Sequence, residues 1–208
     1  RILDIGSGTG GALLGVLQAI RACKPLAHHP VEVVSLDGNA RALAYQARLL
    51  QRFFPGMESI DLRPAVFHSR EHLAACFQAP GFLPGAGFDI MLCFKFVNEF
   101  YRPDGGYEAN RGLYRTLAEV AAQQLGNHGL FMLADVNDRC ARWYFSELLN
   151  REIHQFLETG RHRLRPVLPQ PCMHWFGNCR SRGDCFSQVQ FSVIQSTRGG
   201  YKGTNRSK

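Results

Sequence analysis

Apolar residues follow two different spacings along the first half of the chain, and their alternation predicts an α/β fold. Short apolar runs have the length of buried strands. They occupy residues 1–5, 31–36, 60–67 and 88–94. Between them, apolar positions recur every three or four residues, as on the buried face of a helix. These helical stretches cover residues 12–20, 39–54 and 71–78, and Asn39 can cap the second of them. Strands that alternate with helices in this way are typical of a mostly parallel sheet covered on both faces.

The second half continues the alternation and then changes. Apolar spacing predicts a helix over 114–125, a fifth strand over 130–136 and a long amphipathic helix over 143–157. Farther on, 162–168 and 186–194 alternate apolar and polar residues, which predicts an antiparallel pair of strands at the edge of the sheet.

These elements predict one domain over residues 1–195. The domain would contain a loop-like insertion at 169–185 that is rich in Cys and Arg, and the polar residues 196–208 are predicted to be a disordered tail. Because the first strand begins at residue 1, we expect this sequence to be part of a longer chain with a further N-terminal portion.

Glycines follow the first strand in the stretch LDIGSGTGG. This stretch fits both the G-x-G-x-x-G fingerprint of dinucleotide-binding folds and the G-x-G-x-G loop of another nucleoside-binding family. Glycines let a backbone turn sharply and approach a ligand, and the helix that follows offers free N–H groups. Asp37 ends the second strand, where a carboxylate can accept both hydroxyls of a ribose. The spacing of these features predicts a cofactor that contains a nucleoside.

Over roughly residues 1–136 the sequence resembles the class I S-adenosylmethionine-dependent methyltransferases. LDIGSGTGG is similar to their first motif, VVSLDGN to their second, and FDIMLCF to the strand beneath the methyl-transfer site. The resemblance implies a Rossmann-like sheet of seven strands, mostly parallel, with an antiparallel hairpin at its C-terminal end.

The resemblance also implies which residues hold S-adenosylmethionine. Asp4 would lie near the ammonium group of this cofactor, whereas in an NAD or FAD site its carboxylate would repel the pyrophosphate. Asp37 would hold the ribose, and Gly38 would let the adenine lie close. His68 follows the third strand, where the family contacts the adenine edge, but an ordinary surface histidine is the alternative. The predicted cofactor-binding residues are Asp4, Gly6, Ser7, Gly8, Gly10, Asp37, Gly38, His68 and Phe94.

The residues after the fourth strand are the candidates for the reaction centre. Methyltransferases that act on base amines often carry an Asn or Asp followed by two prolines and an aromatic residue, and this chain has no such motif there. Asn98 and Glu99 are the candidate catalytic residues, because they can orient a substrate amine or hydroxyl. Phe94 or Phe96 can stack on a ring. The alternative is that both aromatics belong to the core and that Glu99 caps or solvates a helix.

The net charge of +7 is concentrated near the C-terminus. Residues 1–150 contain 14 Lys or Arg against 14 Asp or Glu, whereas residues 151–208 contain 10 against 3. This asymmetry predicts an anionic partner, and nucleic acid is the commonest. The basic residues assigned to RNA binding are Arg161, Arg163, Arg165, Arg180 and Arg182. A solvated basic tail without a partner is the alternative.

A late cluster of cysteines is a candidate metal site. Cys172, Cys179 and Cys185, with His174 between them, have the ligand types of zinc or an iron–sulfur cluster. The stretch DCFSQ resembles a loop in the methyltransferase-like proteins associated with the mitochondrial small ribosomal subunit, in which cysteines bind metal. Three cysteines without a metal are the alternative. Seven scattered cysteines favour a reducing compartment, such as the cytoplasm or the mitochondrial matrix.

Together these features predict an S-adenosylmethionine-dependent methyltransferase that acts on RNA, with ribosomal RNA as a candidate. The two alternatives are a non-catalytic factor for ribosome assembly or RNA binding that retains the cofactor site, and a small-molecule methyltransferase. We expect no association with a membrane, because no apolar run reaches the ~18 residues of a membrane helix.

Overall fold

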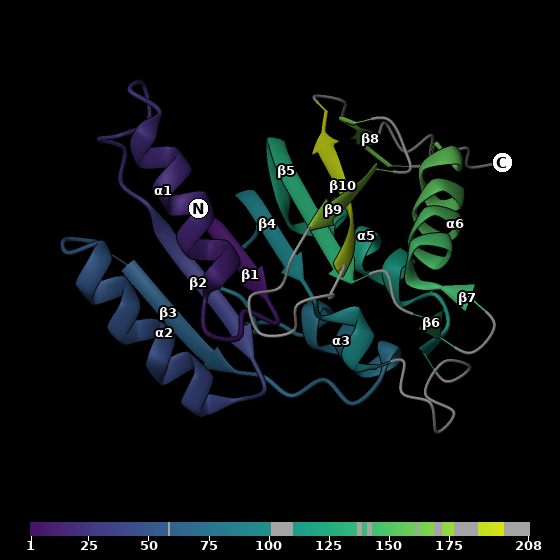
Figure 1. The fold of residues 1–208 in the computed structure, drawn as a ribbon, viewed down its shortest axis with the longest axis horizontal. Coiled ribbons are helices and arrows are strands. Elements are labelled where there is room, and N and C mark those ends of the chain that lie inside the picture. Colours follow the sequence, from purple (N-terminus) through teal and green to yellow (C-terminus); the bar gives the residue numbers. More distant parts are fainter. Residues whose placement is uncertain are drawn as a thin grey trace, which may run out of the picture.

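The described residues form an α/β fold around one large sheet (Figure 1). The computed structural model describes residues 1–57, 59–100, 110–136, 139–140, 143–160, 162–168, 172–176 and 187–197. The helices are α1 (Gly11–Ala22), α2 (Ala40–Phe53), α3 (Arg70–Gln78), the 3-10 turn η1 (Val97–Glu99), α5 (Leu113–Gln124) and α6 (Phe145–Glu158). The strands of the large sheet are β1 (Ile2–Ile5), β2 (Glu32–Asp37), β3 (Ser59–Pro64), β4 (Phe88–Phe94), β5 (Leu125–Val136), β8 (Leu164–Pro166), β9 (Cys172–Phe176) and β10 (Ser187–Ser196). The short strands β6 (Arg139–Cys140) and β7 (Trp143–Tyr144) pair only with each other.

The order of the strands confirms the predicted fold class. Along the sheet they lie in the order β3-β2-β1-β4-β5-β10-β8, and β9 also pairs with β10. The first five of these are parallel to their neighbours. β10 runs antiparallel to β5, β8 and β9. The predicted pair of antiparallel strands is therefore present, although β10 lies between β5 and β8.

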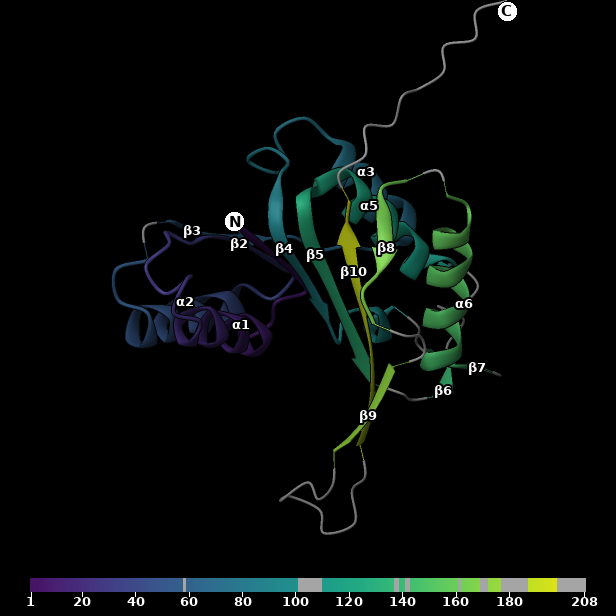
Figure 2. The same cartoon turned by 90° about the horizontal axis from the view of Figure 1, so that it is seen from above.

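Helices cover both faces of the sheet (Figure 2). On one face, α1 and α2 pack over a cluster that includes Leu13, Leu17 and Leu50. On the other, α3, α5 and α6 pack over a larger cluster that includes Phe88 and Phe131. Burial on both faces explains why β1 and β4 are almost continuously apolar. Because β1 to β5 are parallel, their carboxyl ends meet at one edge of the sheet, where a pocket forms.

Two of the predicted strands have different bounds in the structure. The third strand was predicted to reach residue 67, but β3 ends at Pro64. Its partner β2 ends at Asp37, where the chain turns into α2, so the residues after Ala65 have no neighbouring strand to pair with. β5 begins at Leu125, five residues before the predicted start, because Phe88 pairs with Leu125 ahead of a bulge.

The C-terminal part contains two further differences. The stretch 169–185 was predicted to be a loop, but Cys172–Phe176 form β9, which pairs with the first half of a long β10. The polar tail was predicted to begin at Ser196, yet Ser196 is fully buried at the end of β10. Thr197 also donates a backbone hydrogen bond to the Arg163 carbonyl, at 2.7 Å. Residues 198–208 lie outside the described part of the chain, so the disorder predicted for them stays a prediction.

Within the described residues, no helix combines the length and the apolar character that crossing a bilayer requires.

A buried carboxylate of α6 caps the N-terminus of α5. Glu152 accepts hydrogen bonds from the backbone N–H groups of Gly112, at 2.9 Å, and Tyr114, at 3.1 Å. The first N–H groups of a helix have no partner within the helix, so an outside acceptor must satisfy them when they are buried. Burial raises the pKa of Glu152 above its ordinary value, while the N–H donors of α5 act in the opposite direction. The side chain therefore joins α6 to α5.

Glu152→Ala is expected to lower the free energy of unfolding by about 2 kcal/mol or more, because it leaves buried N–H groups without an acceptor. Urea denaturation followed by circular dichroism measures the change. Glu158→Ala is the matched control, since Glu158 lies on the same helix, is exposed and pairs with His154 across one turn. Equal losses in the two variants would contradict the capping role.

Candidate functional site

The glycine loop, residues 6–11, connects β1 to α1 in a conformation that suits glycine. Gly6, Gly8 and Gly10 have φ values of +68°, +53° and +83°, in the left-handed region where other residues are strained. The N–H groups of Gly6 and Ser7 both donate to the Leu36 carbonyl, at 2.8 and 3.1 Å, which ties the loop to the end of β2.

Two of these glycines are also required by close contacts. A Cβ atom on Gly6 would lie 2.4 Å from Cδ2 of Phe96, and one on Gly10 would lie 2.6 Å from Cγ of Gln46. A Cβ on Gly8 would meet no atom within 4 Å. Side chains therefore pack against both ends of the loop, whereas its centre at Gly8 is open, so a ligand can approach the backbone there.

Asp37 connects the end of β2 to the glycine loop. Its Oδ2 atom accepts a hydrogen bond from the Gly8 N–H at 2.8 Å, and its Oδ1 atom accepts one from the Asn39 N–H at 2.7 Å. Each carboxylate oxygen has more than one acceptor site, so capacity remains for ligand hydroxyls. The side chain of Asn39 in turn caps α2, accepting from the N–H groups of Arg41 and Ala42, as the sequence predicted.

A set of buried polar side chains lies beneath the loop. Gln46 of α2 donates through Nε2 to Oγ of Ser35, at 3.0 Å, and accepts from Oγ of Ser7, at 3.1 Å. All three side chains are buried. They hold α2, β2 and the loop in one arrangement. Ser35 and Gln46 were not among the predicted site residues; the available signal was a glutamine on the apolar face of α2, between Leu43 and Leu50.

Asp4 is the most unusual group in this region. It lies on β1 opposite Ser35 of β2, and only 1% of its surface is exposed. Among the described residues, its Oδ2 atom has no hydrogen-bond partner. Burial, and to a lesser degree the charge of Asp37, raises the pKa of Asp4 from 3.8 to about 7. A buried carboxyl with an unpaired oxygen costs stability and is well placed to interact with a cation.

A pocket of about 660 Å³ opens above these groups, at the carboxyl ends of β1, β2, β3 and β4. Its lining residues are Gly6, Leu36, Asp37, Gly38, Asn39, Ala65, Val66, Phe67, His68, Phe96, Glu99, Phe100 and Asn110. Five of the predicted site residues are among them: Gly6, Asp37, Gly38, His68 and Glu99. The structure therefore brings these five together, while their roles in binding or catalysis stay predictions.

The aromatic wall of the pocket comes from Phe67, Phe96 and Phe100. The rings of Phe67 and Phe96 meet edge to face, with centroids 5.9 Å apart, and those of Phe96 and Phe100 do so at 5.0 Å. The exposed His68 stacks on the ring of His72, at 5.2 Å, beside this wall. Such a wall suits a planar ring or an apolar chain in the ligand.

Phe94 and Asn98 lie differently from the prediction. Phe94 does not line the pocket, because its side chain packs on the α1 and α2 face of the sheet; Phe96, the other aromatic residue predicted to stack on a ring, lines it. The reason is Lys95, which follows β4 with φ +55° and reverses the alternation of side chains. With its amide oriented so that the nitrogen faces these two acceptors, Asn98 donates to Asp135 Oδ1, at 3.1 Å, and to the Lys95 carbonyl, at 2.7 Å. Asn98 thus stabilises the turn after β4 and does not line the pocket.

The predicted metal ligands are only partly covered by the structure. Cys172 and His174 both belong to β9. Cys179 and Cys185 lie outside the described residues. Within the residues that are described, no group of three or more His, Cys, Asp or Glu side chains could hold a metal ion. The zinc or iron–sulfur site therefore stays a prediction.

Two of the five arginines assigned to RNA binding have contacts within the protein. Arg163 donates to the Leu125 carbonyl and to Oδ1 of Asn127, the second at 3.3 Å. Arg165 donates to Oε1 of Gln195 at 2.9 Å. Arg161, Arg180 and Arg182 lie outside the described residues.

Solved structures with a similar arrangement of elements include methyltransferases. The magnesium protoporphyrin IX methyltransferase ChlM from Synechocystis PCC 6803, with bound S-adenosylmethionine, matches with a TM-score of 0.51, 12% identity and coverage of 92% of this chain and 68% of that chain. The N-methyltransferase NodS from Bradyrhizobium japonicum WM9, in complex with S-adenosyl-L-homocysteine, matches with a TM-score of 0.53, 14% identity and coverage of 94% and 76%. The chain has the class I methyltransferase fold.

A putative RNA methyltransferase from Pyrococcus horikoshii shares this class I methyltransferase fold, with a TM-score of 0.52, 12% identity and coverage of 96% of this chain and 76% of that chain. No protein-family model and no curated protein sequence matches the chain. Open parallel sheets bind ligands beyond the carboxyl ends of their strands, which is where the glycine loop, Asp37 and the pocket lie. The pocket therefore lies where proteins with this kind of sheet bind their ligands.

Proposed function

We propose that this protein binds S-adenosylmethionine in the pocket and transfers its methyl group to RNA. The observation that carries the proposal is the combination of an open glycine loop with two carboxylates. Asp37 contacts the centre of the loop, and Asp4 lies beneath the loop with an oxygen that has no partner among the described residues. A cofactor with a ribose and two positive charges would satisfy both carboxylates.

The residues present fit this cofactor in size and chemistry. A volume of about 660 Å³ lies within the range of about 300 to 1,000 Å³ that is usual for small-molecule sites. Asp37 would accept hydrogen bonds from the ribose hydroxyls, and Gly38 leaves room beside Val66 for a flat base. Asp4 would stabilise positive charge on the methionine part. The aromatic wall of Phe67, Phe96 and Phe100 would exclude water from one side of the pocket.

When bound, S-adenosylmethionine supplies an electrophilic methyl group on a sulfonium. The chain must then hold a nucleophile in line with that group and without its hydration shell. Glu99 lines the pocket and is exposed, so its carboxylate can accept a hydrogen bond from a substrate amine or hydroxyl and orient the lone pair. Phe96 and Phe100 can pack against the ring that carries the nucleophile.

RNA is the substrate class that the charge favours. The excess of basic residues in the C-terminal quarter suits a polyanion, and the putative RNA methyltransferase from Pyrococcus horikoshii has the same fold. A small molecule would give these cations no role. A binding factor without catalysis would retain the pocket but would transfer no methyl group to RNA.

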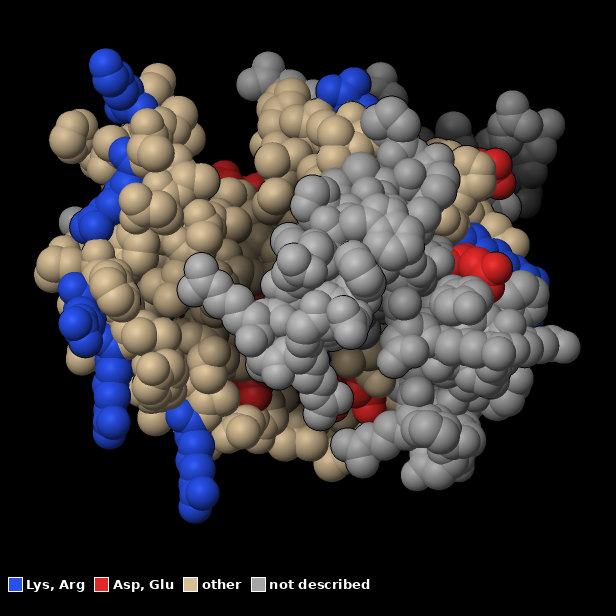
Figure 3. Space-filling model, in the orientation of Figure 1, with Lys and Arg blue, Asp and Glu red and all other residues tan. Residues whose placement is uncertain are grey.

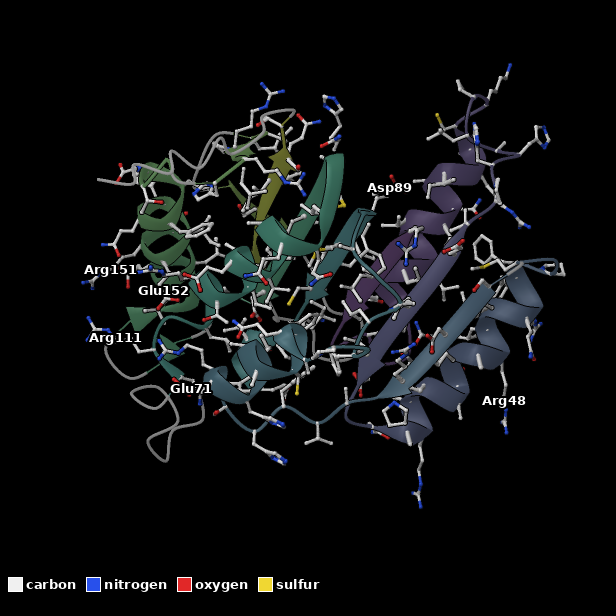
Figure 4. The ribbon with its side chains drawn as sticks, turned by 180° about the vertical axis from the view of Figure 1, so that it is seen from behind. Arg48, Glu71, Asp89, Arg111, Arg151 and Glu152 are labelled. Atoms are coloured by element: carbon white, nitrogen blue, oxygen red, sulfur yellow. The ribbon has the colours of Figure 1, made fainter. Side chains whose placement is uncertain are left out.

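Asp37→Ala tests the cofactor part of the proposal. The variant should bind S-adenosylmethionine and S-adenosylhomocysteine about 10 to 100 times more weakly, because hydrogen bonds to a charged group contribute roughly 1.5–3 kcal/mol. Titration calorimetry measures the change. Asp89→Ala is the matched control, since Asp89 is an exposed carboxylate at the opposite end of β4 (Figure 4). Equal affinities in the wild type and Asp37→Ala would contradict the proposal.

Transfer of labelled methyl groups tests the substrate. Purified protein with labelled S-adenosylmethionine is mixed with separate RNA, protein and metabolite fractions, and the label in each is counted. The proposal expects label in RNA. Label only in metabolites or only in protein would overturn the substrate, and binding without transfer to any fraction would support the non-catalytic factor.

A further inference from the structure

The outer face of α2 carries arginines that have no acidic partner. Arg41, Arg48 and Arg52 are exposed and occur at intervals of seven and four residues, which place them on one side of a helix. Neither α1 nor α2 contains an Asp or Glu, and α1 adds Arg21 in its last turn. In Figure 3 the blue side chains on the left, over α1 and α2, have no red side chain among them.

Several arginines elsewhere in the described part of the chain are paired with acidic residues. Arg63 pairs with Asp61, Arg70 with Glu71, and Arg115 with Glu119. No salt bridge among the described residues involves Arg41, Arg48 or Arg52. Among the described residues no carboxylate neutralises their charge, so it is available to a partner.

An aromatic side chain lies within this set of arginines. Tyr45 is 53% exposed and follows Arg41 by one helical turn. At the end of the helix Phe53 is 52% exposed, and the guanidinium of Arg52 lies over its ring at 5.6 Å from the centroid. Exposed aromatic rings beside cations suit contact with bases and phosphates together.

We propose that the α2 docking face, defined as Arg41, Tyr45, Arg48 and Arg52, binds the phosphate backbone of the substrate RNA. This deepens the proposed function, on which it rests for the identity of the polyanion. From Arg41 to Arg52 the face extends about 17 Å at about 1.5 Å per residue, which is long enough to contact several successive phosphates. The three arginines would contact phosphates, and Tyr45 would stack on an unpaired base.

The location of this face connects it to the pocket. α2 begins at Ala40, directly after Gly38 and Asn39, and both of these line the pocket. Arg41 therefore lies in the first turn beside the pocket entrance, and Arg52 lies at the far end of the helix. An RNA strand bound along α2 would lead one of its nucleotides to the pocket entrance. A surface that bound an unrelated anion would have no reason to begin there.

The test compares RNA binding by two variants that lose the same charge. Arg48→Gln with Arg52→Gln removes two cations from the α2 docking face and leaves Arg41, which is next to the cofactor pocket, unchanged. Arg111→Gln with Arg115→Gln removes two cations on the other side of the molecule, where Arg111 lies near Glu152 (Figure 4). Fluorescence anisotropy with a labelled 20-nucleotide RNA, as a single strand and as a hairpin, gives the affinity at several salt concentrations without any cofactor.

The α2 variant is expected to bind RNA at least ten times more weakly in low salt, with a salt slope that is smaller by about 1.5, because two phosphate contacts are lost. The control variant should stay within about twofold of the wild type. Tyr45→Ala should weaken the single strand more than the hairpin, because stacking needs an unpaired base. Circular dichroism checks that each variant is folded.

Three results would overturn the inference. The first is an α2 variant that binds RNA as tightly as the wild type. The second is a control variant whose affinity for RNA falls as much as that of the α2 variant. The third is an α2 variant that binds phosphatidylserine vesicles more weakly than the wild type does but keeps its affinity for RNA. A failure of the proposed function would give a different result: the wild type would not bind S-adenosylmethionine in calorimetry. The RNA-binding comparison is made without cofactor, so the two outcomes can be told apart.

Discussion

Asp4→Asn is expected to stabilise the protein and to weaken its binding of S-adenosylmethionine. Burial raises the pKa of the Asp4 carboxyl from 3.8 to about 7 in the folded protein. Between these two values the folded chain binds a proton that the unfolded chain has released. The free energy of unfolding therefore falls as the pH rises from about 4 to about 7, and it then stays low. Asparagine has nearly the same shape and no charge, so it removes this penalty.

The expected gain is on the order of a few kcal/mol above pH 7 and vanishes below pH 4. Thermal unfolding across this pH range measures it. Glu119→Gln is the control, because Glu119 is an exposed carboxylate in a surface pair whose loss changes stability little. A gain that is the same at pH 4 and pH 8 would contradict the raised pKa.

Binding should change in the opposite direction. An ionised Asp4 favours the positive charges of the cofactor, so the affinity of the wild type should rise as the pH increases through about 7. Asp4→Asn should bind at least ten times more weakly above pH 7, with little dependence on pH. Calorimetry in buffers with different ionisation enthalpies would show proton release in the wild type only. A residue that costs stability and is needed for binding is typical of a functional site.

The elements that carry the site could be predicted from local patterns. Asn39 predicts the start of a helix, and the apolar run 88–94 predicts a buried strand. Each pattern involves only a few neighbouring residues, and the structure confirms both as the cap of α2 and as β4. The glycine loop and Asp37 could be placed at one edge of the sheet because parallel strands bring their carboxyl ends together. The alternation of strands and helices predicted a mostly parallel α/β sheet, and the resemblance of the motifs to class I methyltransferases implied the class I fold.

Contacts that depend on one backbone angle or on distant partners could not be predicted. The left-handed turn at Lys95 puts Phe96, and not Phe94, in the pocket wall. A lysine in the sequence does not indicate a positive φ. Gln46 contacts Ser35 and Ser7 across two elements, so its role appears only when α2 packs on the sheet. β9 is formed by pairing with β10, which lies more than ten residues farther along the chain. The stretch rich in Cys and Arg was therefore predicted to be a loop, because its local sequence has no strand pattern.

Charge shows the effect of averaging. Over residues 1–150 basic and acidic residues balance at 14 each, so the charge count predicted RNA binding only for the C-terminal quarter. Within that balance, α1 and α2 carry arginines and no acid, while the acids lie on other elements. A count over a long segment therefore concealed a basic helix face, because the face is defined by the fold and not by position along the chain.

Gly6→Ala is expected to destabilise the protein and to abolish cofactor binding. The φ of +68° costs about 1 kcal/mol for any residue with a Cβ. In addition, the new atom would lie 2.4 Å from Cδ2 and 3.0 Å from Cβ of Phe96, so a shift of the ring alone cannot remove the clash. Phe96 is held by Phe67 and Phe100, and Gly6 is held by its hydrogen bond to Leu36. The total loss should reach about 3 kcal/mol.

Gly160→Ala separates the two causes. Gly160 has nearly the same φ, +61°, and a Cβ there would meet no atom within 4 Å, so this control should lose only about 1 kcal/mol and should leave cofactor binding unchanged. Adding Phe96→Ala to Gly6→Ala should cost less than the sum of the single changes, because the second substitution removes the atoms that clash. Urea denaturation gives the four stabilities of this cycle. Strict additivity would show that Phe96 does not pack beneath the loop, and the pocket as described would then be wrong.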